Sequence, residues 1–108
     1  NELILRAGEL GQETMQALQL AAERLQIIGE VRGRGLMIGI ELVTSRETKE
    51  PLSGDRMEKV VGGLLSRGVI MVPCGRNGNV LRLMPSLTIT REYMKKAVDI
   101  LVSVLEDC

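Results

Sequence analysis

The sequence predicts an α+β fold, a two-layer sandwich in which a small, mostly antiparallel sheet carries helices on one face. Two kinds of segment, which alternate along the chain, lead to this fold class. Segments with apolar residues at spacings of three and four alternate with pairs of short runs rich in branched apolar residues and bounded by glycine or proline. The resulting order is helix, strand, strand, helix, strand, strand, helix, in a single domain over residues 1–108.

The first predicted element is a helix over residues 2–26. Its expected buried stripe consists of Leu3, Ala7, Leu10, Thr14, Ala17, Ala21 and Leu25. Gly8 and Gly11 each weaken a helix by roughly 1 kcal/mol relative to alanine. We therefore expect the first half of this helix to need a partner surface, of which a chain of this length offers little.

Two strands should follow, a short one near residues 28–32 and a longer one over residues 36–43. Three glycines in this region, Gly33, Gly35 and Gly39, suit a tight reversal, a bulge, or the close approach of another backbone. The polar stretch TSRETKEPLSG then predicts a connection that Pro51 ends.

The second half repeats the pattern. A helix over residues 55–67 should begin after an N-cap at Ser53 and end before Gly68. VIMVP and VLRLM read as two strands joined by the turn CGRNGN, and they could form a hairpin. Thr90 should cap the last helix, whose apolar side carries Met94, Ala97, Val98, Leu101 and Leu105.

Composition argues against two classes of function. Fourteen basic residues balance fourteen acidic ones, so no net positive charge favours nucleic acid or an anionic membrane surface. Tyr93 is the one aromatic residue, which leaves no platform for stacking bases. Apolar stretches of about five residues are far shorter than a bilayer-spanning helix. We expect neither nucleic acid nor a membrane as a partner.

The cysteines and the lack of histidine narrow the chemistry further. Cys74 and Cys108 are too few for a disulfide framework, and two free thiols are typical of a reducing cytoplasm. Without histidine, imidazole acid–base catalysis is excluded and a zinc site would have to consist of carboxylates, an unusual ligand set. We expect a cytoplasmic protein with no metal site.

One cation interrupts the apolar run VLRLMP, residues 80–85. Side chains alternate along a strand, so the two leucines share one face while Arg82 shares the other with Val80 and Met84. Two interpretations of Arg82 follow from the residues alone. Its stem lies over neighbouring methylenes with the charged head in water, or its planar guanidinium binds a carboxylate.

Two motifs in a fixed order resemble a known family. VRGRGLMIGIELV, residues 31–43, is followed after the predicted middle helix by GNVLRLMPSLTIT, residues 78–90, and then by a terminal amphipathic helix. This arrangement resembles the C-terminal part of class III pyridoxal-phosphate-dependent aminotransferases, most nearly those of the 4-aminobutyrate and acetylornithine type. The resemblance covers essentially the whole chain.

The resemblance implies a fold-type I enzyme, usually a homodimer, whose small C-terminal domain packs beside a large cofactor-binding domain. The helix over residues 1–26 would then pack against that missing large domain. In many members the arginine of the LR pair holds a carboxylate of the amino-acid or 2-oxo-acid substrate, a role that falls on Arg82. Many relatives have two prolines where this chain has Pro85 and Ser86, so we expect a looser turn there. Arg32 and Arg34 are expected to form strand-end or interdomain ion pairs.

The catalytic parts that the family implies lie upstream of the matched region. They are the lysine that holds pyridoxal phosphate, the turn that cradles its phosphate, and the carboxylate at its ring nitrogen. The lysines of this chain, all expected to be solvated, are Lys49, Lys59, Lys95 and Lys96. We therefore expect no catalytic or cofactor-binding residue here, and neither bound pyridoxal phosphate nor transaminase activity from this chain by itself. The missing initiator methionine also leads us to expect a processed product or a piece of a longer protein.

Three functions stay open. The first is the C-terminal part of an aminotransferase that moves an amino group between a carboxylate-bearing amine, such as 4-aminobutyrate, and a 2-oxo acid. The second is an amino-acid racemase of the same family, which would share this domain. The third is a free-standing ligand-binding or oligomerisation module, although such modules commonly open with a strand. The residues that would identify the substrate lie elsewhere.

Overall fold

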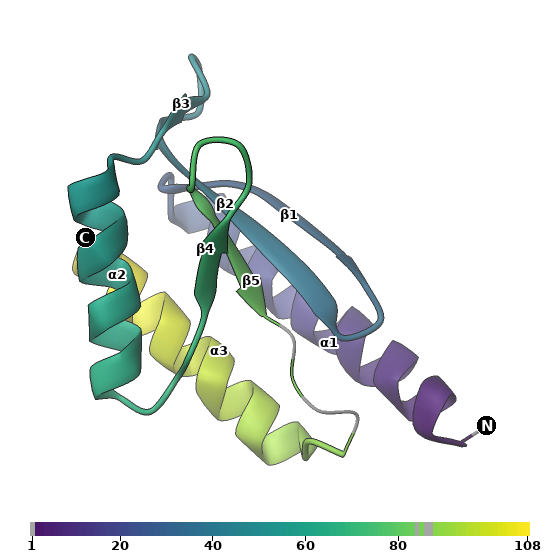
Figure 1. The fold of residues 1–108 in the computed structure, drawn as a ribbon. Coiled ribbons are helices and arrows are strands. Elements are labelled where there is room, and N and C mark those ends of the chain that lie inside the picture. The colour runs from purple at the N-terminus through teal and green to yellow at the C-terminus, as the bar shows by residue number, and fades with distance from the viewer. Residues whose placement is uncertain (1, 84, 86–87) are drawn as a thin grey trace.

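The computed structural model describes residues 2–83, 85 and 88–108, and it confirms the predicted fold class (Figure 1). In chain order the elements are α1 (Glu2–Arg24), β1 (Ile28–Arg34), β2 (Met37–Ser45), β3 (Glu50–Pro51), α2 (Gly54–Ser66), β4 (Val72–Cys74), β5 (Val80–Leu83) and α3 (Arg91–Glu106). The strand pairs among these residues are antiparallel, and the sheet order is β1-β2-β5-β4, with β3 added beside β2.

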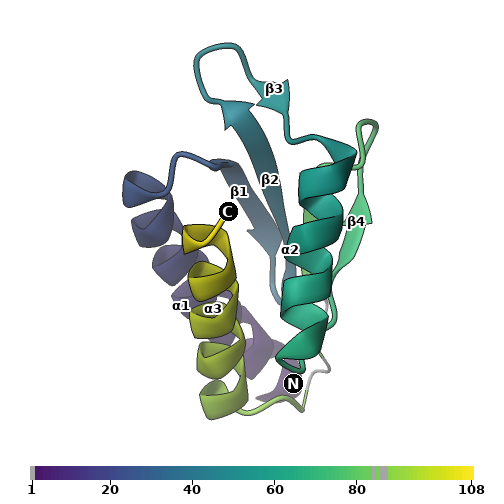
Figure 2. The same ribbon diagram turned by 90° about the vertical axis from the view of Figure 1, so that its left-hand side faces the viewer.

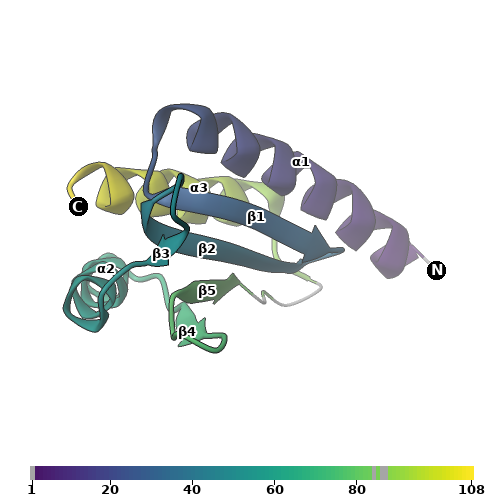
Figure 3. The ribbon, with the colours of Figure 1, turned by 90° about the horizontal axis from the view of Figure 1, so that it is seen from above.

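The helices form a layer on one side of the sheet. α3 packs between α1 and α2 (Figure 2). Fully buried strand residues fill the space between the layers, among them Ile38, Ile40, Leu42 and Leu81. Seen from above, the other face of the sheet has no helix over it in the described part of the chain (Figure 3). None of the described helices is both long enough and apolar enough to cross a membrane.

The buried stripe of α1 differs from the predicted one. Its buried residues are Ala7, Leu10, Gly11, Thr14, Leu18 and Ala21. Ala17 is exposed and Leu3 is 45% exposed, so both predictions are wrong. At 3.6 residues per turn the stripe must alternate steps of three and four, and after Thr14 it takes the longer step to Leu18. The Thr14 hydroxyl stays satisfied because it donates to the carbonyl oxygen of Leu10 at 2.8 Å.

Gly11 allows the first half of α1 to contact a turn of the same chain, so part of the partner surface that this half was expected to need lies within the chain. An added Cβ at this residue would overlap the carbonyl oxygen of Gly35, in the turn between β1 and β2. Gly35 itself has φ +58°, a conformation that L side chains rarely adopt. The two glycines therefore allow the helix backbone and the turn backbone to touch.

α1 ends at Arg24, two residues before the predicted end. The side chain of Arg46, in the turn after β2, donates to the carbonyl oxygens of Ala22, Leu25 (2.9 Å) and Ile28 (3.1 Å). The last carbonyls of a helix have no intrahelical partner, and a cation at this end also favours the helix dipole. A residue from the predicted polar connection thus satisfies the end of α1.

One strand begins later than predicted, and another strand was not predicted. The run VIMVP becomes strand only at Val72, because the N–H of Val69 donates to the carbonyl oxygen of Leu64 at 2.9 Å and so closes α2 instead. The polar connection after β2 contains the short strand β3, which the sequence did not predict. There the N–H of Leu52 donates to the carbonyl oxygen of Leu42 at 3.1 Å.

The predicted helix caps are confirmed. Ser53 Oγ accepts a hydrogen bond from the N–H of Arg56 at 3.3 Å. Thr90 Oγ1 accepts one from the N–H of Tyr93 at 3.2 Å. Gly68 follows α2 with φ +87°, the left-handed conformation that commonly ends a helix. The hairpin of β4 and β5 is also confirmed.

Replacing Gly11 and Gly8 separately should have opposite effects on stability. Gly11→Ala should lower the free energy of unfolding by about 1–3 kcal/mol, because the methyl group enters space held by backbone. Gly8→Ala should raise it by up to about 1 kcal/mol, because an added Cβ at residue 8 meets nothing within 4 Å. Urea unfolding followed by circular dichroism measures both. Equal effects of the two substitutions would contradict this account of α1.

Candidate functional site

Arg82 lies on the face of the sheet that the helices do not cover. Its strand neighbours Leu81 and Leu83 are 0% and 8% exposed and belong to the core, whereas Arg82 is exposed. This alternation is as the sequence predicts. Met84, which was expected to share the face of Arg82, is outside the described residues.

A buried amide sets the register of β5 against β2. Asn79 is 5% exposed, and its Nδ2 donates to the carbonyl oxygen of Leu42 at 2.8 Å. The N–H of Leu42 in turn donates to the carbonyl oxygen of Asn79 at 2.8 Å. Because a slip by one residue would reverse the face of every side chain, this reciprocal pair keeps Arg82 on the open face. The sequence showed only a polar turn residue at this position.

The register places Arg82 in a row that crosses four strands. Gly39 of β2 pairs with Arg32 of β1 on one side and with Arg82 on the other, and Val72 of β4 pairs with Arg82 beyond it. Paired residues of antiparallel strands project to the same face. The open face therefore carries two arginines separated by a residue without a side chain.

Arg32 and Arg34 have different surroundings. Arg32 Nε lies 3.7 Å from a carboxylate oxygen of Glu30, and both side chains are more than half exposed. Both residues lie within β1, so this ion pair is not at the end of the strand. Arg34 has no ion-pair partner among the residues that the structure describes, and it lines a cleft of about 450 Å³ where β5 ends. Pro85 and Met37 line the same cleft.

Arg82 is exposed on its strand in the described part of the chain. Among the described residues its guanidinium has neither a hydrogen-bond partner nor an ion-pair partner, and it does not line the cleft beside Pro85. The looser turn expected at Ser86 falls outside the described residues. A carboxylate bound to Arg82 would therefore stay open to solvent unless a second wall from outside the described residues covers it.

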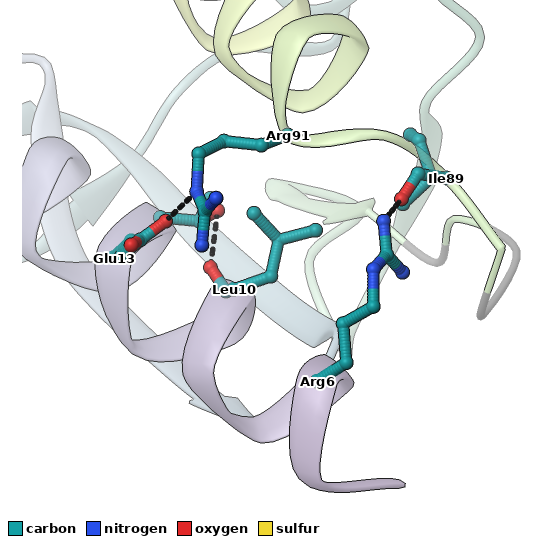
Figure 4. A network of polar contacts seen from close by, with 6 residues as sticks. Arg6, Leu10, Glu13, Ile89 and Arg91 are labelled. Atoms are coloured by element: carbon teal, nitrogen blue, oxygen red, sulfur yellow. Dashed lines mark hydrogen bonds and ion pairs between the residues drawn. The ribbon is translucent and has the colours of Figure 1, made fainter. Parts of the chain in front are cut away.

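α1 contacts the residues around the start of α3 (Figure 4). Arg6 donates to the carbonyl oxygen of Ile89, and Arg91 Nε donates to a carboxylate oxygen of Glu13 at 2.8 Å. The hydrogen bond and the charge of Glu13 raise the pKa of Arg91 above its ordinary value. These partners are 83 and 78 residues apart, so no local sequence pattern could identify them.

The lysines of this chain do not have the surroundings of a lysine that holds pyridoxal phosphate. A lysine that condenses with an aldehyde is activated by burial or by neighbouring cations. The four lysines of the chain are all described, and all four side chains are exposed on a turn, on α2 or on α3. The described residues also contain no group of three or more cysteine, aspartate or glutamate side chains placed to hold a metal ion.

Comparison with known proteins assigns the chain to a family. The family model described as aminotransferase class III matches residues 1–105. A leucine/methionine racemase of Thermococcus litoralis is 42% identical over 106 residues, which cover 98% of this chain and 23% of that protein. A 4-aminobutyrate aminotransferase of Mycobacterium leprae is 43% identical over 108 residues, which cover 97% of this chain and 23% of that protein.

The fold of the chain matches part of a larger solved structure. A Bacillus anthracis aminotransferase superposes with a TM-score of 0.89 at 32% identity, over 99% of this chain and 25% of that one. The chain thus spans about a quarter of the length of the relatives it matches.

Breaking the Glu13–Arg91 pair should loosen the start of α3. In Glu13→Gln, the amides of residues 88–91 should exchange with solvent faster than in the unmodified chain, because Arg91 loses its anionic partner. The difference should shrink at high salt, which screens exposed ion pairs. Hydrogen exchange read by NMR measures this change.

Glu106→Gln is the matched control. Arg24 and Glu106 also join α1 to α3, at the same 2.8 Å, but at the other end of α3. Removal of the Arg24–Glu106 pair should leave amide hydrogen exchange at residues 88–91 unchanged. Equal acceleration in both variants would show that the Glu13–Arg91 contact has no local role.

Proposed function

Because this chain belongs to the class III aminotransferase family, we propose that it is the small C-terminal domain of a pyridoxal-phosphate-dependent aminotransferase, in which Arg82 binds the carboxylate of the substrate. The observation that carries this proposal is the position of Arg82. It is a cation held in a defined register on an uncovered sheet face, with no partner among the described residues.

The rest of the protein is proposed to cover the open face and to supply the second wall. Apolar side chains border Arg82 on that face, and two of them are unusually exposed, Met37 at 60% and Val72 at 57%. Apolar groups gathered on one face are typical of surfaces that another body covers. Leu3 and Leu5 on the first turns of α1, 45% and 69% exposed, would contact the same large domain.

Covering this face would strengthen the interaction between Arg82 and an acid. A guanidinium binds a carboxylate through two parallel hydrogen bonds, and exclusion of water increases their strength. Pyridoxal phosphate, held by the rest of the protein, supplies the electron-withdrawing chemistry of amino-group transfer when it is bound. The role of this chain would be to bind and orient the acid end of the substrate.

The substrate is proposed to be an amino acid of the 4-aminobutyrate kind, with a 2-oxo acid as the partner substrate. The similarity to 4-aminobutyrate aminotransferases supports this choice, and Arg82 suits any molecule with a terminal carboxylate. We also propose a homodimer, as the family resemblance implies. A cytoplasmic location agrees with the free thiols of Cys74 and Cys108.

Racemisation is the second candidate activity, because a leucine/methionine racemase and an alanine/serine racemase are 42% and 36% identical to this chain. A racemase also has to hold the carboxylate of its substrate, so Arg82 would keep its role. A free-standing ligand-binding module has no comparable observation in its favour.

Substitution of Arg82 should weaken the binding of acidic substrates. In the full-length protein, Arg82→Ala should raise KM for carboxylate substrates roughly ten- to a hundredfold, the equivalent of one charge-assisted pair. Arg82→Lys should recover part of the loss, because a lysine keeps the charge without the planar fork. The absorbance of the bound cofactor should stay unchanged in both variants, since Arg82 is proposed not to touch it. An unaltered KM for every carboxylate substrate would contradict the assignment.

Transamination and racemisation differ in their need for a 2-oxo acid. We expect the full-length protein to consume an amino acid only when a 2-oxo acid is present, with one amino product formed for each amino group lost. Chiral chromatography after incubation with a single enantiomer of leucine, without any 2-oxo acid, is the discriminating measurement. Appearance of the opposite enantiomer would favour the racemase instead.

A further inference from the structure

Gly39 leaves a gap in the side-chain layer of the open face. It lies between Arg32 and Arg82 in the cross-strand row described above. Neighbouring strands are about 5 Å apart, so the Cα atoms of the two arginines are separated by roughly 10 Å across the glycine. Two long cationic side chains thus border a space that no side chain of β2 fills.

The fold does not explain a glycine at this position. The sequence suggested a reversal, a bulge or a close backbone contact here, and for Gly39 each of these is wrong. Its φ is not in the left-handed region, and both strand pairings are regular at this residue. An added Cβ would lie 3.4 Å from Val80 Cγ1 and 4.0 Å from the carbonyl oxygen of Arg32, ordinary packing distances.

Other glycines of the sheet show the contrast. An added Cβ at Gly33 would lie 2.9 Å from the carbonyl oxygen of Met37, and Gly35 needs its positive φ. Glycine within a strand also lowers stability, because it has no side chain to pack and loses more backbone entropy on folding. Gly39 therefore lowers stability without a backbone reason, and what it provides is a space on the open face that Val80 borders on one side.

The charges around this gap suit an anion. Arg82 has no partner among the described residues. Arg32 is paired only with Glu30, at 3.7 Å and largely exposed to solvent, and such exposed pairs contribute little to stability. Arg32 can therefore turn toward a second anion with only a small loss of stability.

We propose that the gap above Gly39 receives the acid end of the substrate, so that Gly39 is a specificity-determining residue. The proposal rests on the proposed role of Arg82. The space between the two arginines would take a flat carboxylate, and a bulkier sulfonate or phosphonate would fit less well. A side chain at residue 39 would occupy that space and hold the acid away from the Arg82 guanidinium.

The experiment measures binding of butyrate, a simple monocarboxylate, to full-length variants by isothermal titration calorimetry. Gly39→Val should raise the Kd roughly tenfold or more, comparable to loss of one charge-assisted hydrogen bond. Gly39→Ala should raise it less, and propanesulfonate should be affected more than butyrate in that variant. KM for the amino-acid substrate should rise in parallel while kcat changes little.

Two controls separate this effect from damage to the fold. Gly62 is exposed on α2, and an added Cβ there meets nothing within 4 Å, so Gly62→Ala should leave the Kd unchanged. The Tm of Gly39→Val should equal or exceed that of the unmodified protein, because branched residues favour strands. A Tm lowered by several degrees would overturn the claim that the fold does not need this glycine.

Arg82→Ala measured beside these variants distinguishes the two proposals. Weaker butyrate binding in Arg82→Ala with an unchanged Kd in both Gly39 variants would overturn the role of Gly39 and leave that of Arg82 intact. Unchanged binding in Arg82→Ala would overturn both. We expect the Kd for butyrate to rise in Arg82→Ala and in Gly39→Val. The Kd of Gly39→Ala should lie between those values and that of the unmodified protein.

Discussion

The pairing of β2 with β5 is the constraint on which the rest of the structure depends. β2 is the central strand that contacts β1, β3 and β5, and the reciprocal hydrogen bonds between Asn79 and Leu42 hold β5 in one register against it. That register sends Leu81 and Leu83 into the core and Arg82 to the other face. Core packing and the position of the candidate site are therefore two consequences of the same ladder.

The two faces of the sheet carry residues with different roles. The covered face and the helices bury the apolar side chains that stabilise the chain. The uncovered face keeps the arginines of β1 and β5, together with exposed apolar groups that a larger body could cover. In a chain that spans about a quarter of its relatives' length, this asymmetry is the physical basis of the proposal that the substrate acid lies at the uncovered face and that the cofactor is held elsewhere.

The glycines show which structural roles can be predicted from nearby residues in the sequence and which cannot. Gly68 was predicted correctly as the end of α2, because a helix terminus places its own conformational demand on the next residue. Gly11 was predicted only to weaken α1, whereas it permits contact with the turn at Gly35. Gly39 was assigned a backbone role that it does not have. Gly68 and Gly11 thus serve different purposes, and the purpose of Gly11 and the one proposed for Gly39 depend on neighbours from distant parts of the chain.

The sequence by itself determined the fold class, the order of the elements apart from β3, the caps at Ser53 and Thr90, and the alternation around Arg82. Each of these follows from periodicity or from hydrogen bonds within about four residues. Only the tertiary structure decided that α1 buries Leu18, that Glu13 pairs with Arg91, and that Gly39 lies between two arginines. Those features depend on packing and on strand register, which bring together residues tens of positions apart that no local pattern relates.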